Sequence, residues 1–113
     1  MKKIEAYVRT EKLGEIKGIL VKHNLNGVSI MQVMGCGTQK GWTGFVRGTE
    51  VDYNFLNKLK VEIVLLDEQV EAVVESIIEV DATGEFGDGK IFIYNVEDAI
   101  RIRTKERGDD AIK

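Results

Sequence analysis

The spacing of apolar residues in this chain changes from the period of a strand to that of a helix and back, and this order occurs twice. The repeat restricts the folds that the chain can adopt. Residues 4–8 alternate between apolar and polar side chains, which is the period of a strand. Apolar side chains then recur at helical spacing from the predicted N-cap Thr10 to about Asn24, and Gly27 closes the turn. Residues 28–34 form a second predicted strand, so the first unit is strand, helix, strand.

The same unit returns in the second half of the chain. Residues 59–65 alternate again, Asp67 is the predicted cap of a helix, and residues 90–96 form a last strand. The helix has the clearest apolar stripe in the sequence, made of Val70, Val73, Val74, Ile77 and Ile78. Two successive units of this kind predict an α+β fold of the split βαβ or ferredoxin-like class, with two helices on one side of a four-stranded antiparallel sheet.

Length, charge and residue types narrow the classes of protein further. A chain of 113 residues makes a single domain, 1–113, which buries a core without disulfides or metal. The net charge of −3 argues against a nucleic-acid partner. One cysteine, Cys36, and one histidine, His23, exclude a disulfide within the chain and a metal site built from these residue types, and His23 is the predicted cap at the end of the first helix. Because no apolar run is long enough to span a membrane, we expect a cytoplasmic protein without membrane insertion.

The two faces of the predicted sheet differ in what covers them. The second and fourth strands are apolar on both faces, whereas two helices cover only one face. The other face therefore needs a partner, and a homo-oligomer with closed cyclic symmetry is expected.

Glycine makes the turns in this chain, because proline is absent. Five of the 12 glycines lie within residues 35–48, a composition that predicts a long flexible loop over about 37–55 rather than regular structure. Its tip carries two aromatic residues and two cations, Trp42, Phe45, Lys40 and Arg47. Such residues favour a docking element that orders on a protein partner. The alternative is a solvated hairpin whose aromatic side chains fold back on the body of the domain.

A second glycine cluster fits part of a phosphate-binding motif. Gly84, Gly89 and Lys90 have the spacing Gly-x-x-x-x-Gly-Lys, which exposes backbone amides beside a lysine. Ile91 stands where the motif has the Ser or Thr that holds magnesium, and the segment connects a helix to a strand, the reverse of the usual order. Taken alone, the cluster leaves phosphate binding and a plain turn equally open.

Cations recur at every second position after the last strand, at Arg101, Arg103, Lys105 and Arg107. In extended chain these side chains lie on one side, which favours a bound polyanion such as a nucleoside triphosphate. A solvated charged tail is the alternative. Lys58 adds a cation on the polar face of the third strand, near the base of the long loop.

Several of these segments together resemble the PII nitrogen-regulatory signal proteins, over nearly the whole chain. The most specific match is residues 83–92, Thr-Gly-Glu-Phe-Gly-Asp-Gly-Lys-Ile-Phe, which is close to the nucleotide-loop signature of that family. Residues 37–41, 47–50 and 101–104 agree in order and spacing. The resemblance implies a trimer of ferredoxin-like subunits with nucleotide in each cleft between neighbours. Because the sequence offers no nucleophile with a paired base, we expect a regulator and no enzyme.

The resemblance also implies binding roles for individual residues. The nucleotide, ATP or ADP, would contact Ser29 and Val64 near the adenine, and further Gly35, Gly37, Thr38, Gly87, Asp88, Gly89, Lys90, Arg101 and Arg103, with the two arginines reaching across the subunit boundary. Gln39 would supply a ligand to Mg²⁺ beside ATP. The effector 2-oxoglutarate would chelate the same ion and lie against Gln39, Lys40, Gly41 and Lys58.

By the same resemblance, the long loop would carry the signal to other proteins. Its shape would differ between ATP and ADP and would change with 2-oxoglutarate. Trp42, Phe45, Arg47 and Tyr53 would contact the target. That target would be an ammonium transporter, whose pore Arg47 would plug, or an enzyme or regulator of nitrogen metabolism.

Some positions depart from the family pattern. Val51 stands where a tyrosine is often nucleotidylated, so this modification is chemically impossible there, and Tyr53 is the nearest substitute. Cys36 and Thr38 replace an aromatic residue and an arginine, which leaves the preference between ATP and ADP open. The alternative function is a divergent PII-like adenylate sensor that does not respond to 2-oxoglutarate. An RNA-binding sheet, the rival from another class, needs an aromatic pattern that residues 90–95 lack.

Overall fold

The computed structural model describes residues 1–38, 44–46, 49–51, 53–85 and 87–113. Its strands are β1 (Lys2–Arg9), β2 (Val28–Thr38), β3 (Gly44–Val46), β4 (Thr49–Val51), β5 (Tyr53–Leu65) and β6 (Ile91–Asn95). Its helices are α1 (Leu13–Lys22), α2 (Val70–Asp81) and the short α3 (Asp109–Ile112), and 3₁₀ turns over Thr10–Lys12 and Asp67–Gln69 precede α1 and α2. None of the helices within this described part of the chain is long and apolar enough to cross a membrane.

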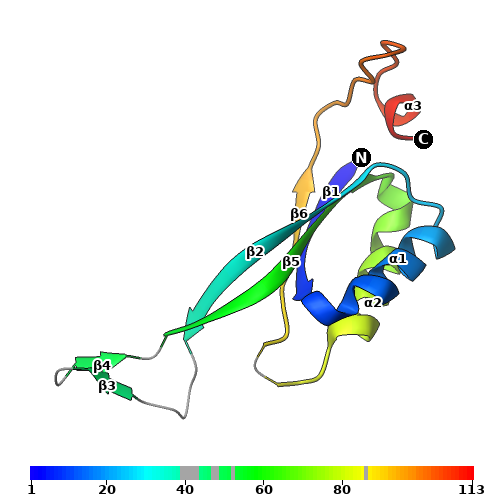
Figure 1. Ribbon diagram of the computed structural model, residues 1–113. Coiled ribbons are helices and arrows are strands. Elements are labelled where there is room, and N and C mark those ends of the chain that lie inside the picture. The colour runs from blue at the N-terminus through cyan, green and yellow to red at the C-terminus, as the bar shows by residue number, and fades with distance from the viewer. Residues whose placement is uncertain (39–43, 47–48, 52, 86) are drawn as a thin grey trace.

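Four strands make one antiparallel sheet in the order β2-β5-β1-β6, and α1 and α2 both lie on one of its faces (Figure 1). The first strand of the chain, β1, is central in this sheet. Its residue Ile4 pairs with Ile63 of β5 on one side and with Ile93 of β6 on the other. The predicted α+β, ferredoxin-like arrangement of two helices on a four-stranded antiparallel sheet is confirmed.

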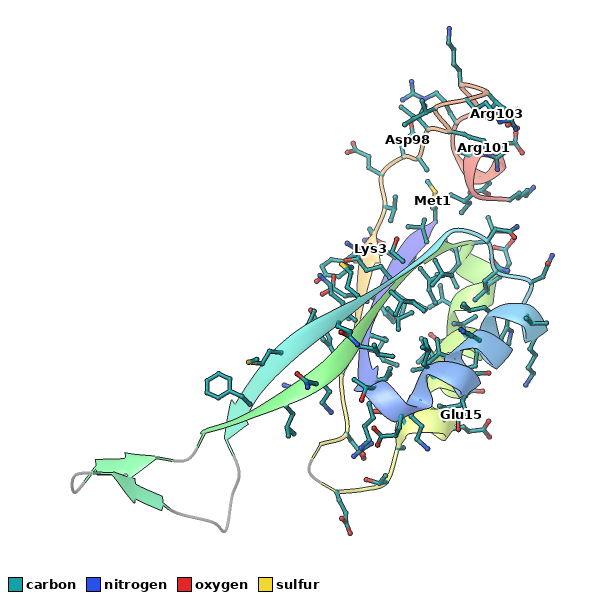
Figure 2. The ribbon with its side chains drawn as sticks, viewed as in Figure 1. Met1, Lys3, Glu15, Asp98, Arg101 and Arg103 are labelled. Carbon is teal, nitrogen blue, oxygen red and sulfur yellow. The ribbon has the colours of Figure 1, made fainter. Side chains whose placement is uncertain are left out.

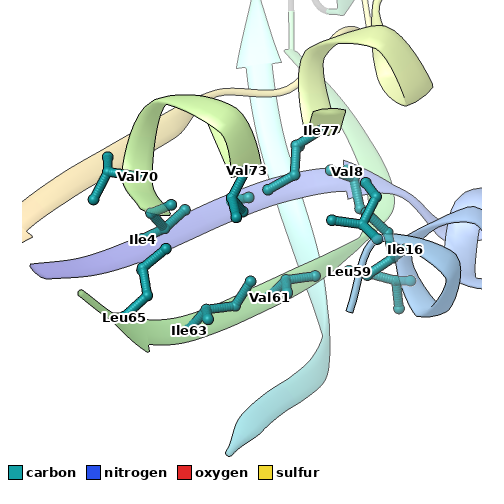
Figure 3. Close-up of a cluster of buried hydrophobic side chains, with 12 residues drawn as sticks. Ile4, Val8, Ile16, Leu59, Val61, Ile63, Leu65, Val70, Val73 and Ile77 are labelled. Carbon is teal, nitrogen blue, oxygen red and sulfur yellow. The ribbon is translucent and has the colours of Figure 1, made fainter. Parts of the chain in front are cut away.

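The hydrophobic core lies between the sheet and these two helices (Figure 3). The alternation along β1 turns Ile4, Ala6 and Val8 toward the helices, where each is at most 1% exposed. Side chains from β5, α1 and α2 complete the cluster, namely Leu59, Val61, Ile63, Leu65, Ile16, Ile19, Val70, Val73 and Ile77. Removal of this apolar surface from water is the main stabilising term. Ile78, predicted on the same stripe of α2, is 51% exposed and lies outside the buried cluster.

The predicted side-chain caps at the starts of the two helices are wrong. Thr10 and Asp67 each begin a 3₁₀ turn, and the residue before each turn makes no side-chain cap. The chain leaves β1 already at Arg9, so Thr10 lies inside the turn and not ahead of it. The carboxylate of Asp67 accepts a hydrogen bond from the N-terminal amine of Met1 at 2.5 Å. This bond occupies the carboxylate that would otherwise cap the backbone amides of the helix.

The predicted cap at the end of α1 is confirmed, since His23 is its C-cap residue. Asn24 follows in the left-handed conformation, with φ of +52°. The N–H of Leu25 then donates to the carbonyl of Leu20 at 2.9 Å, the long hydrogen bond that closes a helix before a left-handed residue. The turn to β2 is completed by Gly27, with φ of +70°.

A hairpin of β2 and β5 extends well beyond the part of the sheet that the helices cover (Figure 1). Pairing runs from Val28 opposite Ile63 to Thr38 opposite Tyr53, and the short strands β3 and β4 pair with each other between them in the sequence. The strands β2 and β5 end two or three residues inside the predicted loop of about 37–55, and the short strands β3 and β4 lie between them in the sequence. That this segment is a flexible docking loop stays a prediction. Glycine weakens a strand but does not prevent it where a paired strand completes the hydrogen bonds.

No helix of the described residues lies over the second face of the sheet (Figure 1). Its centre is charged: Glu5 on β1 is only 8% exposed, and its carboxylate lies 3.8 Å from the ammonium group of Lys3 and 3.9 Å from that of Lys60. The outer strands are apolar there, as predicted, with Met31 of β2 40% exposed and Phe92 of β6 45% exposed. That this face contacts a second copy stays a prediction.

The contrast between two adjacent isoleucines of α2 tests the assignment of the core. Ile77→Ala is expected to lower the free energy of unfolding by about 3 kcal/mol, because the site is fully packed. Ile78→Ala is the matched control and is expected to cost under about 1 kcal/mol, because half of its side chain is already in water. Urea denaturation of both variants at one protein concentration measures the difference. Equal losses would contradict the assigned burial.

Candidate functional site

The second glycine cluster, residues 84–90, lies in the connection from α2 to β6. We call residues 83–89 the glycine loop. It lies at the end of β1 where Arg9 is found, because β6 runs antiparallel to β1 and begins with Ile91 opposite Ala6. Within the loop, Gly84 and Gly87 have φ of +80° and +100°. Glycine adopts these left-handed conformations without strain, so the loop requires glycine at both positions.

The carboxylate of Asp88 closes the glycine loop from inside. It accepts hydrogen bonds from the amide of Thr83 at 2.9 Å, from the hydroxyl of Thr83 at 2.7 Å and from the amide of Gly84 at 2.8 Å. The guanidinium of Arg9 adds a charged donor at 2.8 Å. The bonds from Thr83 and then Arg9 hold the pKa of Asp88 far below its usual range, so the carboxylate is charged at neutral pH. Asp88, predicted to bind nucleotide, is thus engaged within the loop.

Gly89 brings the end of the loop into direct contact with β1. A Cβ atom at this position would lie 1.4 Å from the carbonyl oxygen of Tyr7, so only glycine fits. The amide of Tyr7 donates to the carbonyl of Lys90 at 2.9 Å, and the amide of Gly89 donates to the carboxylate of Asp81 at 3.3 Å. The exposed side chain of Lys90 follows directly on this fixed backbone.

Lys58, the predicted 2-oxoglutarate residue, lies beside the glycine loop. It pairs with Arg9 of β1 and with Val33 of β2, and its ammonium group donates to the carbonyl of Gly87. A Cβ at Gly35 would lie 3.5 Å from Cγ of Lys58. The structure therefore brings together Lys58, Gly35 and the glycine loop, which are far apart in the sequence.

Val64 and the two predicted arginines lie toward the opposite end of the sheet. Val64 pairs with Lys3 near the start of β1. Ser29, exposed on β2, pairs with Glu62 and is therefore level with Glu5 in the middle of β1. Figure 2 shows Arg101 and Arg103 beyond this same end. The two arginines follow Asn95 of β6, which pairs with Lys2, so most of the length of the eight-residue strand β1, about 23 Å at about 3.3 Å per residue step, separates them from the glycine loop.

The basic segment after β6 is a closed turn and not the extended row that the sequence predicts. Ile100 bridges to Arg107, and Lys105 has a left-handed φ of +63°. Arg107 donates to Asp98 from Nε at 3.0 Å and from Nη2 at 2.6 Å, and these bonds hold the pKa of Asp98 below its usual range. The cations therefore do not share one side of an extended chain.

Arg101 points back into this turn. Its guanidinium donates to the carboxylate of Glu106 at 3.0 Å and to the carbonyl of Lys113 at 2.7 Å. Thr104 donates its hydroxyl to the same carboxylate at 2.6 Å. These contacts fix the position of Arg101 from the C-terminal side, whereas the side chain of Arg103 is exposed.

Part of the predicted site lies outside the described residues. Gly37 and Thr38 are the last residues of β2, Phe45 belongs to β3, Val51 to β4, and Tyr53 begins β5. The predicted residues Gln39, Lys40, Gly41, Trp42 and Arg47 fall outside the described ranges.

Sequence reasoning missed two residues that organise the glycine loop, Arg9 and Asp81. Arg9 ends β1 and contacts both Asp81 and Asp88, and Asp81 is a buried acid at the C-terminal end of α2. The sequence does hold one signal for Asp81. A negative charge at the C-terminus of a helix meets the negative end of the helix dipole, and so it indicates a specific cationic partner.

Comparisons with known proteins agree along nearly the whole chain. The family model described as "Nitrogen regulatory protein P-II" matches residues 1–106. A nitrogen regulatory protein P-II of Rhizobium meliloti is 52% identical over 112 residues, which cover 99% of this chain and 100% of the relative. One from Pyropia yezoensis is 46% identical with the same coverage.

A solved structure agrees in fold as well as in sequence. The structure of B. subtilis GlnK superposes with a TM-score of 0.82 at 37% identity, and covers 98% of this chain and 97% of its own. The predicted resemblance is therefore confirmed. The chain belongs to the nitrogen regulatory protein P-II family, whose members are regulatory signal transducers and not enzymes.

Proposed function

We propose that this chain senses ATP and ADP together with 2-oxoglutarate and passes the signal to nitrogen-metabolism proteins through the segment between β2 and β5. It acts in the cytoplasm as a homotrimer, with a nucleotide in each cleft between neighbours. An ammonium transporter, an enzyme or a regulator of nitrogen metabolism is the target. The residues that meet the target are Trp42, Phe45, Arg47 and Tyr53.

The separation of the two groups of candidate residues carries this proposal. A triphosphate is much shorter than the roughly 23 Å of β1, so one chain does not bring the glycine loop and Arg103 to the same phosphates. In a closed cyclic assembly, the glycine loop of one subunit meets the basic turn of the next. The uncovered face of the sheet, with its apolar outer strands, supports such an assembly.

Each group has a distinct role at the nucleotide. Lys90 pairs with the phosphates from one subunit, and Arg101 and Arg103 pair with them from the next, since charged donors form the strongest bonds to phosphate oxygens. Gly87 and Gly89 allow the loop backbone to approach. The carboxylate of Asp88 shapes the loop and does not itself pair with phosphate, because it is bonded within the loop and has the same sign of charge. That Asp88 contacts the nucleotide through its backbone or its position in the loop stays a prediction.

The effector site adjoins the phosphates. Gln39 offers a side-chain oxygen to Mg²⁺. This cation prefers oxygen ligands, and in nucleotide sites the phosphates supply some of them. Lys58, Lys40 and Gly41 surround 2-oxoglutarate, with the ammonium group of Lys58 against one carboxylate. The contact of Lys58 with the glycine loop supports a connection between effector and nucleotide.

A PII-like adenylate sensor that does not respond to 2-oxoglutarate is the second candidate. One of the three N–H donors of Lys58 already bonds to the carbonyl of Gly87, which holds the ammonium group toward the glycine loop and favours this candidate. Calorimetry with ATP and Mg²⁺, with and without 2-oxoglutarate, separates the two candidates. Independent binding of the two ligands favours the second.

Mixing two defective variants tests whether neighbours share the nucleotide site. Lys90→Ala and Arg103→Ala alone are each expected to weaken ATP binding about 10- to 100-fold, because each removes charged bonds to phosphate. In trimers co-assembled from equal amounts of both, about one quarter of the sites combine an intact loop with an intact basic turn. Calorimetry should therefore detect this fraction with wild-type affinity. Mixed trimers that bind no better than the single variants would contradict a shared site.

A second variant tests the metal ligand. Gln39→Ala is expected to abolish the effect of 2-oxoglutarate on ATP binding and to change ATP affinity in its absence by less than about threefold, because phosphate contacts remain. Titration of ATP and Mg²⁺ with and without 2-oxoglutarate measures both effects. Lys90→Ala is the control with the opposite pattern, a loss of ATP binding itself. Equal loss of both responses in Gln39→Ala would contradict its role.

A further inference from the structure

Asp81 is a buried acid that the proposed nucleotide contacts do not include. It is the last residue of α2 and is only 6% exposed. A carboxylate at this position meets the negative end of the helix dipole and loses hydration, so the position is unfavourable unless partners hold the charge. The groups that contact this carboxylate therefore indicate what Asp81 does in the fold.

Groups from two other segments hold this carboxylate. Oδ1 accepts the amide N–H of Arg9 at 3.0 Å, and Oδ2 accepts the amide N–H of Gly89 at 3.3 Å. The guanidinium of Arg9 lies 3.5 Å from Oδ1 and donates to the backbone carbonyl of Asp81 at 2.6 Å. The ends of α2, of β1 and of the glycine loop thus meet at one side chain.

Arg9 carries the connection to the start of the glycine loop. Its Nη2 donates to Asp88 at 2.8 Å and lies 3.4 Å from the hydroxyl of Thr83. Asp88 in turn binds the amide and the hydroxyl of Thr83. Both ends of the loop, Thr83 and Gly89, therefore depend on the same pair of Arg9 and Asp81.

We propose that Asp81 is a positioning residue for phosphate binding, acting through Arg9 and Gly89 without touching the ligand. The inference rests on the proposed function, because it requires that the glycine loop binds a nucleotide. Without the carboxylate, the amide of Gly89 and the guanidinium of Arg9 lose a shared acceptor, and the loop adopts other conformations. The apparent affinity for a nucleotide then falls with the fraction of chains whose loop has the binding conformation.

A role in stability alone has a different consequence. Loss of a pair that only stabilises the fold lowers the melting temperature and leaves the affinity of the folded protein unchanged. Loss of a positioning residue changes the affinity at temperatures where every chain is folded. It also changes the protection of the loop amides from solvent exchange, because local opening exposes them.

Asp81→Asn tests this role with little change in size. In the full-length protein, well below its melting temperature, we expect the Kd for ATP to rise about tenfold by calorimetry. Hydrogen–deuterium exchange in the absence of nucleotide is expected to become faster in peptides that cover residues 82–90. Asp67→Asn is the matched control, because it removes an exposed ion pair at the opposite end of the sheet, and it is expected to change neither quantity.

Arg9→Met tests the same connection from its other side. We expect a similar loss of ATP affinity in this variant. In the double variant with Asp81→Asn, the ATP affinity is expected to be at most about twofold lower than in either single variant, because both changes break the same connection. If Asp81→Asn fails to fold, the affinity and exchange of Arg9→Met decide. Unchanged ATP affinity beside a wild type that binds ATP overturns this inference alone. A wild-type chain that binds no ATP overturns the proposed function with it.

Discussion

The pairing of β1 with β5 on one side and with β6 on the other is the constraint on which the rest of the molecule depends. It places Ile4, Ala6 and Val8 beneath the helices, and so builds the core. It also fixes what lies at each end of the sheet. The glycine loop enters β6 at the Arg9 end, and the basic turn leaves β6 at the opposite end. One strand length therefore sets both the stability of the domain and the distance between its two candidate binding groups.

Charge, in addition to apolar burial, determines the shape of the glycine loop. Asp88 draws the start of the loop together, and Asp81 holds its end against β1. Both carboxylates meet at the guanidinium of Arg9, whose planar fork can serve two acceptors at once. Asp88 is partly accessible, so solvent weakens its contribution, whereas Asp81 is buried and its bonds are less screened. The buried carboxylate of Asp81 therefore contributes more than Asp88 to holding the loop in this conformation.

The sequence predicts the elements of this fold well because their signals are local. Alternation in residues 4–8 and 59–65 and the stripe of α2 depend on neighbours along the chain, and the structure has each of them. The failures are of another kind. Residue preferences predict a cap at Asp67 and loop residues at 37–38 and 53–55, but the N-terminal amine of Met1 and the pairing of β2 with β5, both distant in sequence, determine the outcome. Arg9 and Asp81 were missed for the same reason, since 72 positions separate them.

The separation of the binding groups links assembly and ligand binding in the proposed trimer. A nucleotide that bonds to Lys90 of one chain and Arg103 of the next binds only the assembled state, so it stabilises the subunit contact by mass action. By the same linkage, the loop conformation affects assembly. A loop that is less often in the binding conformation has a lower affinity for the nucleotide that joins the two subunits. Lys58 donates to the carbonyl of Gly87 inside this arrangement, so an effector carboxylate that draws Lys58 away must also change the loop. In the proposed trimer, effector binding, nucleotide binding and the subunit contact therefore all depend on the conformation of the glycine loop.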